Sequence, residues 1–278
     1  MDVSQALEVW WVLPVSVCIA TIALALGISG ALFFSPLFLL VVGLEPSQAI
    51  GAGLITELFG TGVGAFNYVR QRVVDFMTVR FLLAASIPAA VAGAYLANQI
   101  RPGVLQVILG ITLFVLAVIV LYYGTLKGKP PTPIAPDESR KMTIIKARDG
   151  NTYSYKTCRR YIGVTLSGIG GLLTGLVSVG LPEITTQQLT LRCDIPSRIA
   201  VATAIFVLTV TVFFAAGVHA LEAEPAWYVV VWSIPGVILG AQIGPRLAGR
   251  IPTRIAERVI ATLFLTIGIL VIVMQIID

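Results

Sequence analysis

The segment that decides the fold is the apolar run WWVLPVSVCIATIALALGISGALFFSPLFLLVV at residues 10–42. As one continuous α-helix it would be about 50 Å long at 1.5 Å per residue, whereas the hydrocarbon layer of a bilayer is roughly 30 Å thick. Gly27-Ile-Ser-Gly30 and then Ser35-Pro36 interrupt the run. These residues predict a broken helical hairpin that returns to the side it entered from, and a single full span stays open as the alternative.

The composition extends this interpretation to the whole chain. Hydrophobic residues make up 57% and charged residues 12% of the 278, about half of the roughly 25% charged residues of a soluble domain. The sequence therefore predicts an all-α, multi-pass protein of the inner (cytoplasmic) membrane. The apolar stretches fall at about 10–43, 47–69, 76–98, 103–124, 161–191, 198–220, 226–248 and 255–277.

The chain repeats itself across a polar linker. Ser86-Ile87-Pro88 reappears as Ser233-Ile234-Pro235, and Gly30 aligns with Gly180. The order of these matches predicts a first transmembrane repeat at 1–124 and a second at 161–278, an organisation typical of secondary transporters.

The linker at 125–160 is rich in Lys and Arg. Basic loops lie in the cytoplasm by the positive-inside rule, so we place the linker there. Within it, β-forming residues flank Asp149-Gly150, a pair that favours a hairpin turn.

Each repeat is predicted to be a broken helical hairpin plus three transmembrane helices, and the remaining charges predict that the two repeats are inverted. The arginines between Arg246 and Arg258 also fall on the cytoplasmic side if both 10–43 and 161–193 return to the side they entered from. Glu222 and both termini then lie outside.

The two breaks, Gly27 to Pro36 and Val177 to Glu183, are the leading candidates for a binding site. Broken backbone at membrane depth is tolerated where it is buried in protein or lines a wet cavity, and the freed N–H groups of a helix start suit an anion. The alternative is that the glycines only allow close helix packing. The candidate substrate-binding residues are Gly27, Ser29, Gly30, Ser35, Pro36, Ser178, Gly180, Pro182, Gln187 and Gln188.

Two acidic residues inside apolar stretches are candidates for proton coupling. Glu57 lies midway along 47–69, and Glu183 follows the second break directly. Burial favours the neutral form of a carboxylic acid, so either residue could carry a proton across with the anion. A structural role for each glutamate remains the alternative.

At these positions the sequence resembles the sulfite exporter TauE/SafE family, whose members have two repeats that each open with a Gly-rich break and a proline. The first copy here reads Gly27-Ile-Ser-Gly-Ala-Leu-Phe-Phe-Ser-Pro36, then Gly43-Leu-Glu-Pro46, and the second reads Ser178-Val-Gly-Leu-Pro182-Glu. Ala31, Leu32 and Phe33 stand where the family has further glycines. The resemblance implies export or uptake of sulfite or a small organosulfur or sulfonate anion.

We therefore predict a secondary transporter that moves a small anion by alternating access, with an anion channel and a non-transport scaffold as alternatives. An enzyme is not expected, because one histidine and two acids inside the membrane offer little for catalysis. We expect no cofactor, no metal and no nucleic acid partner, only the lipid bilayer and the substrate, and a homo-oligomer is left open. His219 is expected at a loop end, and the three cysteines are expected to pack without a disulfide.

The predicted topology can be tested by labelling. Cysteines introduced at Glu222 and at Lys141 are expected to react with a membrane-impermeant thiol reagent from opposite faces, because the linker and the Glu222 turn lie on different sides. Equal reactivity of both positions from one face would contradict the inverted arrangement.

Overall fold

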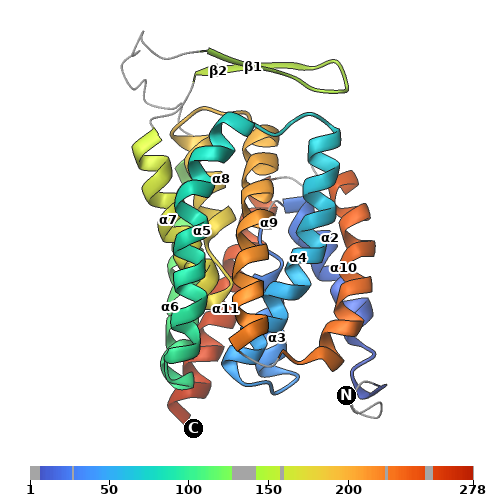
Figure 1. Ribbon diagram of the computed structural model, residues 1–278, viewed down its shortest axis with the longest axis vertical. Coiled ribbons are helices and arrows are strands. Elements are labelled where there is room, and N and C mark those ends of the chain that lie inside the picture. Colours follow the sequence, from blue (N-terminus) through green and yellow to red (C-terminus); the bar gives the residue numbers. More distant parts are fainter. Residues whose placement is uncertain are drawn as a thin grey trace.

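The computed structural model describes residues 7–26, 28–126, 142–156, 160–222, 225–247 and 253–277. Nearly all of this chain is helical (Figure 1). The helices are α2 (Val12–Leu26), α3 (Ala31–Leu40), α4 (Pro46–Arg70), α5 (Phe76–Gln99), α6 (Pro102–Leu126), α7 (Arg160–Val177), α8 (Leu181–Leu191), α9 (Ser197–Glu222), α10 (Trp227–Leu247) and α11 (Thr253–Ile277). Among the described helices, α4, α5, α6, α9 and α10 are long and apolar enough to cross a membrane.

Each of the two long apolar stretches forms a pair of short helices. The first divides into α2 and α3, and the second into α7 and α8. The α2–α3 pair opens toward the end of the bundle where α11 finishes, whereas the α7–α8 pair opens toward the β-hairpin at the opposite end (Figure 1). The first stretch is therefore a broken helical hairpin and not one continuous helix.

The helices of the two halves of the chain pack against each other. α5 lies along α7 and α2 lies along α10, while α6 pairs with α11. α4 and α9 contact each other and are the most buried of the long apolar helices. Glu57 and Thr56 of α4 and Thr211 of α9 therefore lie on the best-enclosed long helices of the bundle.

Glycine brings two of these helix pairs into backbone contact. A Cβ atom added to Gly175 of α7 would lie 2.0 Å from the carbonyl oxygen of Ala90 in α5, and one added to Gly240 of α10 would lie 2.6 Å from that of Val17 in α2. Such small-residue interfaces are the usual way for membrane helices to gain packing, since lipid supplies little hydrophobic driving force between them.

The described part of the linker is an antiparallel hairpin of β1 (Met142–Lys146) and β2 (Thr152–Lys156), in which Met142 pairs with Lys156. It turns at the predicted Asp149-Gly150 pair and lies across one end of the bundle (Figure 1). The Arg198 guanidinium hydrogen-bonds to the Asp149 carboxylate and lowers its pKa. This exposed pair contributes little stability by itself.

Two expectations about single residues are wrong. His219 lies within α9 rather than at a loop end, is fully buried, and has Nε2 at 2.9 Å from the carbonyl oxygen of Gly175. The carbonyl groups that end a half-helix inside a bundle need donors, which explains an imidazole beside the end of α7. Cys193 is disulfide-bonded, whereas Cys18 is a free thiol.

The close α5–α7 contact predicts that one methyl group added at Gly175 lowers the stability of the fold. Gly175→Ala is expected to lower the melting temperature of the purified protein, because overpacking costs about 1–3 kcal/mol. Gly217→Ala in α9 is the matched control, since a Cβ atom there meets nothing within 4 Å and alanine favours a helix over glycine. Fluorescence-detected size exclusion after heating measures both, and equal melting curves for the two variants would contradict the packing.

Candidate functional site

The two helix breaks meet between the ends of the bundle. α3 and α8 both begin at the breaks, so their N-termini point into the same buried region. The hydroxyl of Ser35 lies 2.6 Å from that of Ser178, and the backbone N–H of Ser29 donates to Glu183 Oε1 at 2.9 Å. Residues separated by about half the chain thus form one polar centre.

Glu57 enters this centre from α4. Its Oε1 accepts a hydrogen bond from the Ser29 hydroxyl at 2.5 Å and one from the Ala31 N–H at 3.3 Å. Its Oε2 is buried and has no hydrogen-bond partner among the described residues. The Glu57 side chain is only 1% exposed. Because Oε2 has no partner in the described chain, it can carry a proton or accept a hydrogen bond from a bound molecule.

Glu183 joins the two breaks to each other. While Oε1 accepts from Ser29 of the first break, Oε2 accepts from the Gly180 N–H of its own break at 3.2 Å. The two glutamates together satisfy N–H groups at the start of both half-helices, which otherwise have no partner within a helix.

The backbone of the second break needs special conformations. Ser178 has φ 63° and Gly180 has φ 126°, values that L-residues other than glycine rarely adopt. The hydroxyl of Thr174 accepts from the Leu181 N–H at 3.1 Å and so satisfies another freed donor.

The first break depends on a close approach of α3 to α4. A Cβ atom added to Gly53 would lie 2.3 Å from the Ser35 hydroxyl oxygen. Glycine at this position therefore lets Ser35 reach the centre.

Two further buried hydroxyl pairs join α4 to α10 and α5 to α9. Thr56 pairs with Ser233 at 2.6 Å, and Ser86 pairs with Thr211 at 2.8 Å. The two Ser-Ile-Pro segments were evidence of duplication in the sequence, but the pairing of their serines with threonines was not predicted. Their location inside apolar stretches, where an unpaired hydroxyl is costly, was the available signal.

The other predicted residues make none of the hydrogen bonds described above with their side chains. Gly30 and Pro182 belong to the breaks themselves, whereas Pro36 lies within α3, and Gln187 and Gln188 lie in the later turns of α8. Gly27 lies outside the described residues.

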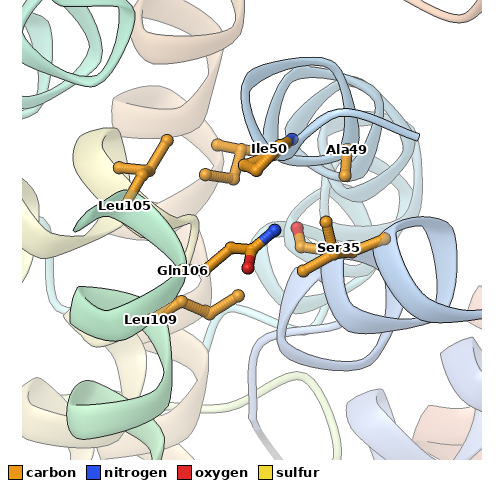
Figure 2. Close-up of a pocket in the computed structure, with 8 residues that line it drawn as sticks. Ser35, Ala49, Ile50, Leu105, Gln106 and Leu109 are labelled. Atoms are coloured by element: carbon orange, nitrogen blue, oxygen red, sulfur yellow. The ribbon is translucent and has the colours of Figure 1, made fainter. Parts of the chain in front are cut away.

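The polar centre is closed in this structure. Ser29, Ser35 and Ser178 are completely buried. On the α3 side lies a narrow cleft in which Gln106 of α6 points toward Ser35 (Figure 2), and the cleft is too narrow to hold a water molecule. Gln106 was not predicted, because nothing in the sequence distinguishes a single amide near the end of an apolar stretch from an ordinary helix-end residue.

Half-helix N-termini that meet in the interior of an all-helical bundle are a feature of membrane transport proteins. Such N-termini carry a partial positive charge and can bind an anion without a catalytic group. The fold and the centre therefore define a multi-pass membrane transporter.

Comparison with known proteins identifies the family. Residues 12–271 match the family "Sulfite exporter TauE/SafE", and the chain belongs to it. The chain is therefore a membrane transporter and not an enzyme, as the sequence predicted.

Curated relatives carry similar descriptions. The chain is 22% identical to "Probable membrane transporter protein YunE" of Bacillus subtilis (strain 168) over 80% of this chain and 82% of that protein. It is 26% identical to "Probable membrane transporter protein YjnA" of the same organism over 78% and 83%. No solved structure matches the chain significantly.

A double-mutant cycle can test the contact between the breaks. Ser35→Ala and Ser178→Ala are expected to show a coupling free energy of about 1 kcal/mol, the usual net contribution of one hydrogen bond. Denaturant unfolding in mixed micelles measures the coupling. Ser16→Ala combined with Ser178→Ala is the control and should be additive, because the Ser16 hydroxyl has no partner in the described chain. Additivity of the Ser35 and Ser178 changes would contradict the hydrogen bond between these two hydroxyls.

Proposed function

We propose that this protein is a secondary transporter that moves a small anion, sulfite or a small organosulfur or sulfonate anion, across the cytoplasmic membrane by alternating access. The observation that carries the proposal is the contact between the two half-helix N-termini, in which Ser29 N–H reaches Glu183 and Ser35 reaches Ser178. The substrate class comes from the family.

In this proposal the two glutamates occupy the donors that an anion would use. Glu183 accepts the N–H groups of Ser29 and Gly180, and Glu57 accepts that of Ala31. A substrate anion can accept these same hydrogen bonds once the carboxylates move aside. Since like charges in one buried site repel, an anion binds more readily when a glutamate is protonated. Substrate and proton then bind together, which is the basis of a coupled carrier.

The helix pairing supports two related halves. If α2 to α6 are exchanged with α7 to α11, the contact of α5 with α7 becomes that of α10 with α2, and the contact of α3 with α4 becomes that of α8 with α9. The two broken hairpins open toward opposite ends (Figure 1), in agreement with an inverted relation between the repeats.

The charges support a cytoplasmic location of the β-hairpin end. Arg72, Arg148 and Arg192 are exposed there, and the positive-inside rule places such residues in the cytoplasm.

The closed centre favours a carrier over a channel. A channel needs a continuous polar-lined path, whereas α3, with the sequence ALFFSPLFLL, offers only Ser35 as a polar side chain. A buried centre that opens to one side at a time fits the structure better.

Flux of labelled sulfite into sealed proteoliposomes, with and without a pH gradient, tests the proposed substrate. We expect uptake above that of protein-free vesicles, and competition from small sulfonates. Absence of flux for sulfite and for sulfonates in both orientations of the gradient would overturn the substrate class.

A Glu183→Gln variant tests the coupling. A gradient of one pH unit supplies about 1.4 kcal/mol per proton, enough for about tenfold accumulation of the anion. The variant is expected to keep anion binding but to lose this accumulation, since glutamine cannot release a proton. Glu222→Gln, at the exposed end of α9, is the control and should accumulate like the parent. Unchanged proton-driven flux in Glu183→Gln would move the coupling role to Glu57.

A further inference from the structure

α8 buries more polar groups than the fold satisfies. Four of its consecutive side chains have a buried polar atom without a hydrogen-bond partner in the part of the chain that the structure describes. These atoms are Thr185 Oγ1, Thr186 Oγ1, Gln187 Oε1 and Gln188 Oε1. A buried polar atom left unpaired is destabilising, and four in succession on one short helix indicate that α8 has polar contacts in another state of the protein.

The related half-helix is different. α3 contributes Ser35 alone as a polar side chain, and the Ser35 hydroxyl is paired with that of Ser178. Of the two half-helices, in the part of the chain that the structure describes, α8 alone carries unpaired polar atoms, between the central contact and the β-hairpin.

The β-hairpin covers the far end of α8. The ring of Tyr155 in β2 is buried against Leu189 in the last turn of α8 and against Ile195 and Ile199 beyond it. Among the described residues of the hairpin, Tyr155 alone is a fully buried member of this apolar cluster, whereas Ile145 and Tyr153 are partly buried. Its position places an aromatic ring over the end of the polar helix.

Hydrogen bonds fix this cover to both halves of the chain. The Tyr155 hydroxyl donates to Asp75 at the α4–α5 turn at 2.8 Å, and the Arg148 N–H donates to the Gln71 carbonyl oxygen at 3.0 Å. Arg198 of α9 donates to the Gln71 side chain at 2.9 Å as well as to Asp149. Because the hairpin bridges α9 and the α4–α5 turn, it holds this end of the bundle closed.

We propose that α8 forms an access subsite for a small hydrated oxyanion on the linker side, separate from the central contact, and that the β-hairpin is the cover of that subsite. The inference rests on the proposed anion transport. The threonine hydroxyls can donate to anion oxygens, and the glutamine amides can donate and also accept from the water that the anion carries. None of the four groups is charged, so the subsite binds the anion weakly enough to pass it on.

Thiol labelling tests the cover without any need for transport. Gln187→Cys is labelled with the anionic reagent 2-sulfonatoethyl methanethiosulfonate in the full-length protein, and the parent chain gives the background from Cys18. Adding Tyr155→Phe is expected to raise the labelling rate from the linker side about fivefold, the factor that corresponds to one net hydrogen bond. Tyr153→Phe on the same strand is the matched control and should change the rate less than twofold, since its hydroxyl has only a 3.4 Å contact with Arg198.

Transport kinetics test the subsite itself. Thr185→Val and Gln188→Leu are expected to raise the apparent KM for sulfite about fivefold, again the factor of one hydrogen bond. Thermal stability should be kept, because the Thr185 hydroxyl and the Gln188 amide oxygen have no partner among the described residues. Thr190→Val is the matched control, since its hydroxyl donates to the Thr186 carbonyl oxygen within α8, and its KM should stay within about twofold of the parent. A residue with a purely structural role would change stability and leave KM unaltered.

The outcomes separate this inference from the proposed function. A labelling rate that is unaffected by Tyr155→Phe, or KM values that stay at the parent level in both α8 variants, would overturn the subsite while sulfite flux stands. If sulfite is not transported but Tyr155→Phe still exposes Gln187→Cys to the linker side, the substrate assignment fails and the covered access route is supported.

Discussion

The structure depends on how backbone groups freed by broken helices are satisfied away from water. Each break exposes N–H groups in the interior, and an unpaired buried N–H is about as costly as a lost hydrogen bond. Glu183 satisfies freed N–H groups of both breaks, because one of its oxygens accepts from Ser29 and the other from Gly180. The location of Glu57, Ser35 and Ser178 follows from the same requirement, since they supply the remaining acceptors and donors around the contact.

This requirement also connects stability with transport. The groups that hold the breaks together in the closed state are carboxylates, which occupy the donors suited to an anion. In the proposed mechanism, closing without substrate and binding substrate are therefore alternative uses of the same N–H groups. A carrier needs such an exchange, because a centre that collapsed into apolar packing would offer the anion nothing when it reopened.

Much of the fold could be predicted from local properties of the sequence. The length of the run at 10–42 and its interruption indicated the α2–α3 hairpin, because thickness of the bilayer and rise per residue are fixed quantities. The turn pair Asp149-Gly150 indicated the hairpin for a similarly local reason. These features depend on residues close together in the chain.

The contacts between distant residues could not be predicted in the same way. Nothing in the sequence pairs Glu183 with Ser29 or Thr56 with Ser233, because such contacts are set by how the helices cross. His219 shows the same limit, since a lone imidazole near a stretch end reads as a surface residue until α7 is seen to end beside it. The candidate breaks were visible in the sequence, but the partners that complete them come from the other half of the chain.

The glycine contacts between α5 and α7 and between α2 and α10 affect how the bundle can move. Each contact joins one helix from before the linker to one from after it, and their backbones touch at Gly175 and Gly240. A boundary between rigid parts that ran between the two halves of the chain would have to separate both of these helix contacts. A boundary that keeps α2 with α10 and α5 with α7 would preserve them. The tight packing thus joins helices from before and after the linker, so rigid parts that kept both contacts intact would each contain helices from both halves of the chain.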